Sequence, residues 1–159
     1  AYTFDKNVKL FERHKVLSKT ELKARKQIML ENYSRIVNIE ALTMLDMAKK
    51  QIYPAVSKYA AELTRGYLAK KSAGFESNGD KECIAKLNDT GDKIYAAVNK
   101  LDALLKESAN FTEADAHALF LRDKVINAMK EYTILIEWNI AVLVSAGTQF
   151  SEPTGAYSV

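Results

Sequence analysis

The stretch IAKLNDTGDKIYAAVNKLDALL, residues 84–105, decides the fold. Its apolar positions and one glycine recur at alternating steps of three and four residues; they are Ile84, Leu87, Gly91, Ile94, Val98, Leu101 and Leu105. Alternation of this kind places one stripe along a helix, as in the seam of an antiparallel helix pair or a coiled coil. The stretch therefore predicts a long helix that packs lengthwise against a neighbour. Gly91, which costs about 1 kcal/mol in a helix interior, indicates a close backbone approach or a local bend.

A second long helical pattern precedes this stretch. The sequence Ser18-Lys19-Thr20-Glu21 has the form of a capping box and predicts that a helix begins at Lys19. Hydrophobic residues then recur every three or four positions, and we interpret them as the stripe that faces the core: Leu22, Met29, Tyr33, Ile36, Ile39, Leu42, Met44, Met47 and Ile52. Pro54 removes a backbone donor and disfavours a helical conformation at Tyr53, which predicts a kink or a break there.

The remaining segments complete an all-α prediction. Residues 4–14 have the pattern of a short first helix, and residues 74–79 form a turn after which Asp80 is the expected cap of the next helix. A last helical pattern runs from about Thr112 to Gly147. The sequence thus predicts an all-α antiparallel bundle of four to five long helices over residues 1–147, with a C-terminal tail, residues 148–159, outside the bundle.

Charge and composition exclude several classes of partner. The net charge of +3 arises from 23 basic and 20 acidic residues that are interleaved along the chain, which is not the pattern of a nucleic-acid-binding surface. The longest apolar stretch, residues 134–144, is interrupted by Glu137 and Asn139 and is shorter than the ~20 residues that span a membrane. One cysteine fits a reducing, cytoplasmic setting. Because the chain begins with Ala1, we expect a processed protein or a piece of a larger one.

The sequence offers no catalytic, cofactor-binding or metal-ligating residue. His14 and His117 lie far apart and have no second ligand at metal-site spacing, so surface or capping roles are the expectation. Cys83 has no histidine partner nearby in the sequence, and we expect it to be a half-buried structural thiol. The chain also lacks a phosphate-binding loop, a dinucleotide-binding glycine motif and the Glu-x-x-His pairs of di-iron bundles.

Three polar residues interrupt apolar stretches and are candidate interface or buried polar positions. They are Glu40, Glu137 and Asn139. A carboxylate inside an apolar environment needs a partner, so each glutamate predicts a structural ion pair or a contact at an interface. All three would also line the polar pocket of a ligand-binding bundle.

Two contiguous segments carry a family resemblance. ENYSRIVNIEALTMLDMAKKQIYPAVSKY, residues 31–59, resembles the C-terminal helical region of type III glutamine synthetases. The upstream segment KNVKLFERHKVLSKTELKARKQIMLENY, residues 6–33, resembles the same region, in which a short helix, a Val-Leu link and a capped long helix follow one another. The similarity covers residues 4–73 well and residues 80–135 only as a helical pattern.

The resemblance implies a role in a larger enzyme. This chain would be the C-terminal, non-catalytic assembly domain of a cytoplasmic glutamate–ammonia ligase that uses ATP and a divalent metal, Mg or Mn, and forms a ring-shaped homo-oligomer. Its partners would be the rest of the parent enzyme and the neighbouring subunits. The alternative is a free-standing helical bundle that acts as an adaptor or sensor and binds a small molecule or a partner helix.

Overall fold

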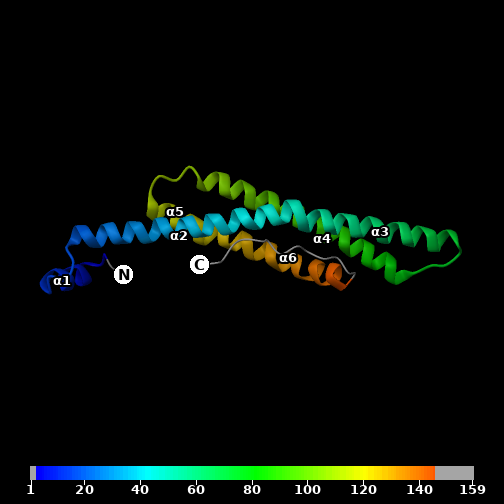
Figure 1. The fold of residues 1–159 in the computed structure, drawn as a ribbon, viewed down its shortest axis with the longest axis horizontal. Coiled ribbons are helices and arrows are strands. Elements are labelled where there is room, and N and C mark those ends of the chain that lie inside the picture. The colour runs from blue at the N-terminus through cyan, green and yellow to red at the C-terminus, as the bar shows by residue number, and fades with distance from the viewer. Residues whose placement is uncertain (1–2, 146–159) are drawn as a thin grey trace. The chain divides into compact units, whose positions relative to one another are not determined.

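The computed structural model describes residues 3–145, and every regular element in that range is helical (Figure 1). Along the chain these elements are α1 (Asp5–Arg13), α2 (Lys19–Met47), η1 (Ala48–Ile52), α3 (Tyr53–Ser72), α4 (Asn78–Ser108), α5 (Ala114–Phe120), η2 (Leu121–Val125) and α6 (Ile126–Ser145). The all-helical prediction is confirmed. The expected tail, residues 148–159, lies outside the described residues.

The predicted interruption at Pro54 is a π-helical turn and not a break. Tyr53 has φ −60° and ψ −45°, so the residue before the proline is helical, against the prediction. The π-turn η1 directly precedes Tyr53, and the chain continues through it from α2 into α3. A π-turn bonds over five residues instead of four, which gives the backbone a wider turn just where proline removes a donor and crowds the preceding carbonyl.

A second π-turn, η2, joins α5 to α6 in the same way. The described residues therefore form four continuous helical segments, namely α1, α2 to α3, α4, and α5 to α6. The expected four to five long helices are only roughly matched, because α1 has nine residues.

The capping box is confirmed at the start of α2. The backbone N–H of Ser18 donates to Oε2 of Glu21 over 2.7 Å, and the N–H of Glu21 donates to Oγ of Ser18 over 3.3 Å. These two bonds satisfy backbone donors that the first helical turn leaves without partners. The backbone bond from Ser18, followed by the bond from its hydroxyl, holds the pKa of Glu21 below its usual range.

Replacing Ser18 by alanine is expected to lower the free energy of unfolding by about 1 kcal/mol, because the N–H of Glu21 loses its acceptor. Urea unfolding at pH 7 measures this loss. The control is Thr20→Ala, because Thr20 is also exposed and lies two residues after Ser18. A loss as large in Thr20→Ala would contradict the capping role.

Glu21 makes a pH-dependent contribution to the free energy of unfolding. Because its pKa is lowered in the folded state, this contribution is present above the unfolded-state pKa and is lost as pH falls through the folded-state pKa. The stability difference between the chain and Glu21→Gln should therefore shrink at acidic pH.

The turn before α4 corrects one predicted cap. Oγ of Ser77 accepts a hydrogen bond from the N–H of Asp80 over 3.3 Å, so Ser77 occupies the capping role expected for Asp80. The carboxylate of Asp80 instead accepts from Nζ of Lys70 in α3 at 2.6 Å. Gly74, with φ +88°, supplies the left-handed residue that ends α3, a conformation that side chains disfavour.

The described chain groups into two compact units, and α2 and α4 each contribute to both. The first unit holds residues 1–42 and 103–127. Its interior combines side chains from α1, α2, α4, α5 and η2, and the buried ones are Val8, Leu22, Ser34, Val37, Ala41, Leu105, Ser108, Ala118, Leu121 and Val125. An ion pair between Lys26 of α2 and Asp115 of α5, 2.6 Å apart, lies at its surface.

The second unit holds residues 43–102 and, within the described part of the chain, residues 128–145. In it α3 and α4 run antiparallel: Tyr53 contacts Tyr95 with ring centroids 5.5 Å apart, and Lys70 pairs with Asp80 near the connecting turn. A Cβ added to Gly91 would lie 3.6 Å from Cγ1 of Val56, an ordinary van der Waals distance, so a side chain of α3 and not its backbone faces this glycine. The other buried residues of the unit are Leu45, Ala48, Ile52, Ala60, Leu87, Ile94, Val98, Leu101, Ala128, Tyr132 and Asn139.

Candidate functional site

Groups able to do chemistry are dispersed over the described residues. His14 is exposed after α1, and the half-buried ring of His117 stacks on Phe111 at 6.1 Å between centroids. Cys83 is half-buried, as expected for a structural thiol. Within residues 3–145 no three His, Cys, Asp or Glu side chains lie close enough together to hold a metal ion.

The three candidate polar residues occupy different environments. Glu40 of α2 and Glu137 of α6 are exposed, so a buried position is wrong for both, and an interface contact stays a prediction. The helix positions explain the correction, because each glutamate lies on the solvent side of its helix although its sequence neighbours are apolar. Asn139 is buried; its Nδ2 donates to the carbonyl of Leu135 over 3.0 Å, while Oδ1 has no hydrogen-bond partner.

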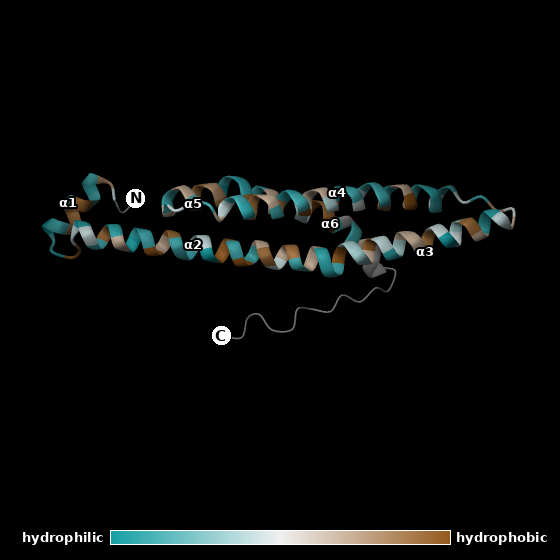
Figure 2. Cartoon of the chain, turned by 90° about the horizontal axis from the view of Figure 1, so that it is seen from above, coloured by the Kyte–Doolittle hydropathy of each residue, from teal (hydrophilic) through white to brown (hydrophobic). Residues whose placement is uncertain are grey.

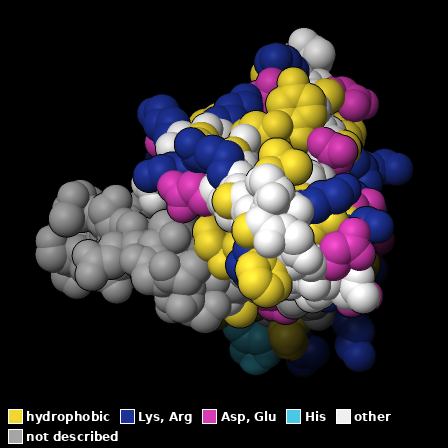
Figure 3. All heavy atoms as spheres, turned by 90° about the vertical axis from the view of Figure 1, so that its right-hand side faces the viewer, with side chains coloured by type: hydrophobic (Ala, Val, Ile, Leu, Met, Phe, Trp, Pro, Cys, Tyr) yellow, Lys and Arg dark blue, Asp and Glu magenta, His cyan; other side chains and the backbone are white. Residues whose placement is uncertain are grey.

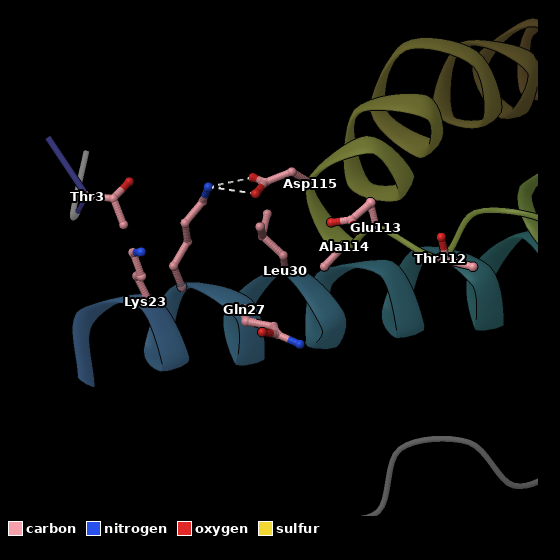
Figure 4. Close-up of a pocket in the computed structure, with 9 residues that line it drawn as sticks. Thr3, Lys23, Gln27, Leu30, Thr112, Glu113, Ala114 and Asp115 are labelled. Atoms are coloured by element: carbon pink, nitrogen blue, oxygen red, sulfur yellow. Dashed lines mark hydrogen bonds and ion pairs between the residues drawn. The ribbon is translucent and has the colours of Figure 1, made fainter. Parts of the chain in front are cut away.

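The larger hollow of the first unit, about 600 Å³, lies beside the Lys26–Asp115 ion pair. Lys23, Lys26 and Leu30 of α2 face the start of α5 across it, and Figure 4 shows the ion pair bridging the two elements. Both partners of that pair are substantially solvated, so it contributes little to stability. The hollow contains opposite charges that already neutralise each other, which does not favour one class of ligand.

A smaller hollow of about 290 Å³ in the same unit has a more mixed lining. It is bordered by Glu31, Ser34, Arg35, Asn38, Leu105, Ser108, Ala109 and His117. Oγ of Ser108 donates to the carbonyl of Leu105 over 2.8 Å, whereas Oγ of Ser34 is buried without a partner among the described residues. Neither hollow is lined by Glu40, Glu137 or Asn139, the residues that a ligand-binding bundle was expected to use.

The most extensive unusual feature is an exposed aliphatic face on α2, which we call the outward α2 face. Its members are 51–56% exposed and are Ile28, Met29, Ile36, Ile39 and Leu42. The side of α2 that packs into the interior carries smaller residues: Ser34, Val37 and Ala41. Figure 2 shows hydrophobic residues recurring along α2 between hydrophilic ones.

This finding corrects the predicted core stripe of α2. Met29, Ile36, Ile39 and Leu42 were expected in the core, yet all four are exposed. The helix carries apolar residues on two opposite sides. The side with the larger side chains has the more obvious spacing in the sequence, and it was therefore predicted to face the core. The signal that identifies the buried side is the step of three and four through Ser34, Val37 and Ala41, which has less bulk but continues into Leu45 and Ala48.

Exposed apolar side chains elsewhere are scattered by comparison. Leu68 and Phe75 are exposed near the α3–α4 turn. Seen toward that turn, hydrophobic side chains alternate with lysine, arginine and acidic groups (Figure 3). Scattered residues of this kind are normal on a protein surface, whereas several large apolar residues gathered on one side of a helix mark a candidate site of interaction.

The comparisons with known proteins bear on the segment that contains the outward α2 face. The family model described as glutamine synthetase C-terminal domain matches residues 1–71. This match covers 71 of the 159 residues. The chain is 31% identical over 134 residues to glutamine synthetase of Butyrivibrio fibrisolvens, and 26% identical over 133 residues to type-3 glutamine synthetase of Dictyostelium discoideum.

Both similarities cover 80% of this chain but only 18% of the relative. The chain thus spans less than a fifth of the length of the curated relatives it matches. None of the solved structures matches it. Among the described residues, no helix is both long and apolar enough to cross a membrane.

Proposed function

We propose that this chain is the C-terminal, non-catalytic assembly domain of a type III glutamine synthetase. The observation that carries the proposal is the match of residues 1–71 to the glutamine synthetase C-terminal domain, together with similarity to two synthetases over 80% of the chain. The parent enzyme would make glutamine from glutamate and ammonia with ATP and a divalent metal, Mg or Mn.

The domain would act through its surfaces. Its helices would form an antiparallel bundle over residues 1–147, and its partners would be the rest of the parent enzyme and the neighbouring subunits of a cytoplasmic homo-oligomer. Glu40 and Glu137, both exposed, would serve as interface contacts. Nucleic acid and membrane are not among the proposed partners, since the charges of the chain are interleaved.

The native mass of the protein tests this proposal. An antibody raised against the 159-residue chain should detect, in the source cells, a band several times heavier than 17.8 kDa that copurifies with glutamine synthetase activity. Deleting the region from that polypeptide should change the number of subunits in the assembled enzyme, while the catalytic part still binds ATP. A native band at 17.8 kDa would overturn the proposal in favour of a free-standing adaptor or sensor.

A further inference from the structure

The outward α2 face has the composition of a buried interface and lies in solvent. Five aliphatic side chains occupy it between Ile28 and Leu42, a distance of about 21 Å along a helix. That length corresponds to about four helical turns, enough to accommodate one partner helix. Arg35 and Glu40 are exposed charged residues of the same stretch. Arginine beside large apolar side chains is enriched at protein–protein interfaces.

The opposite side of the same helix already has its packing partners. Val37 and Ala41 are buried at 4% and 0% exposure, so this segment of α2 does not need its outward residues to hold the first unit together. Exposing five large aliphatic side chains disfavours the isolated state, since each gains free energy when it leaves water. The outward face therefore has a role that the described fold does not use.

Charge argues against a second copy of this chain as the occupant. A symmetric dimer brings the same patch of each copy together. Arg35 lies at the middle of the outward face, so antiparallel pairing centred on the face would place the two Arg35 side chains near each other at the symmetry axis. Parallel pairing would align Arg35 with Arg35 and Glu40 with Glu40. Like charges in direct opposition destabilise both arrangements.

We infer that the outward α2 face docks onto an apolar surface in the catalytic part of the same synthetase polypeptide. The inference rests on the proposed function and names the surface through which that function is exercised. Two observations favour this occupant: the face lies entirely within residues 1–71, the segment that matches the family, and the matching relatives are more than five times longer than the segment they share with this chain. The two exposed charges, Arg35 within the face and Glu40 beside it, would then meet opposite charges on a non-identical surface.

Thiol labelling in two settings tests the inference. Ile36→Cys is placed in a Cys83→Ser background, both in the full synthetase polypeptide and in the 159-residue chain, and the rate of reaction with a maleimide is measured. A thiol covered by a docked partner should react more slowly in the full polypeptide than in the short chain, by a factor of about ten or more, because labelling depends on access to the thiol. Ile134→Cys is the matched control: Ile134 is an isoleucine 69% exposed on α6, outside the family match, and should react at similar rates in both settings.

Each outcome is decisive. Equal rates for Ile36→Cys in both settings would overturn the docking inference while the proposed function, tested by native mass, would stand. Labelling of the short chain that slows as its concentration rises would identify a second copy as the occupant and overturn the inference. A native band at 17.8 kDa would overturn both. Slowing at Ile36→Cys without slowing at Ile134→Cys would support docking through the outward α2 face.

Discussion

Replacing Ile94 by alanine is expected to lower the free energy of unfolding by about 2 to 4 kcal/mol, because the side chain is fully buried in the second unit and its removal leaves a cavity. Ile94 lies at the centre of the α4 stripe, close to Gly91, where α3 approaches at Val56. The surrounding backbone is helical on every side and cannot collapse easily into the space. Urea unfolding followed by circular dichroism at 222 nm measures the loss.

Ile134→Ala is the matched control for this substitution. Ile134 lies in α6 of the same unit but is 69% exposed, so its truncation should change the free energy of unfolding by about 0.5 kcal/mol or less. Both variants remove the same atoms from the same residue type and differ only in burial. Comparable losses in the two variants would show that the interior of the second unit does not pack around Ile94.

Replacing Tyr132 by phenylalanine is expected to make the protein more resistant to alkali. Tyr132 is buried in the second unit, and burial raises its pKa to about 12 from an ordinary value of 10.0. For an acid whose folded-state pKa is raised, the stabilising contribution is present below the unfolded-state pKa and is lost as pH rises through the folded-state pKa. The free energy of unfolding of the wild-type chain should therefore fall by about 2 kcal/mol between pH 10 and pH 12. The variant lacks the phenol and should not show this fall.

The comparison at neutral pH serves as the control for Tyr132→Phe. The hydroxyl of Tyr132 is buried without a hydrogen-bond partner among the described residues, so its removal should leave stability at pH 7 unchanged or about 1 kcal/mol higher. Free energies of unfolding for both proteins at intervals from pH 7 to pH 12 give the two curves. Parallel curves over that range would contradict the burial of the phenol, and a large loss at pH 7 would reveal a hydrogen bond to its hydroxyl.

Local patterns in the sequence predicted the helices well where one physical cause acts alone. The capping box at Ser18 and Glu21 depends on backbone donors that every helix start leaves without partners, so four consecutive residues suffice to locate it. The α4 stripe was also predicted correctly, since Leu87, Ile94, Val98, Leu101 and Leu105 are all buried. Among the Leu, Ile and Val residues of that helix only Leu104 lies outside the stripe, and the spacing therefore identifies the packed side.

The same reasoning failed on α2 because the helix has two apolar sides. Periodicity shows which residues share a face but not which face meets the core. The stripe through Met29, Ile36 and Ile39 has the larger side chains and was therefore predicted to face the core. The residues that pack inside are Val37 and Ala41. A second apolar side is what a domain needs when it packs both internally and against a partner.

Two further features had no reliable signal in the sequence. The π-turn η2 contains neither proline nor glycine; its residues read LRDKV and fit an ordinary helix. The exposure of Glu40 and Glu137 was equally hidden, because a charged residue among apolar neighbours lies on the solvent side of a helix as readily as in its interior. Each of these depends on tertiary packing and not on the local segment.

The π-turn η1 has a consequence for any chimaera made within this helix. From Ala48 onward the buried positions Ile52, Val56 and Ala60 follow at intervals of four residues, and in an ordinary α-helix each such interval rotates the side chain by about 40°. The wider turn of η1 absorbs part of that rotation, so that the residues of α3 return to the interior. A foreign helix of regular pitch that replaced the chain from Ala48 onward would lack this correction. It would keep its apolar side inward only if residues 48–52 were retained ahead of it.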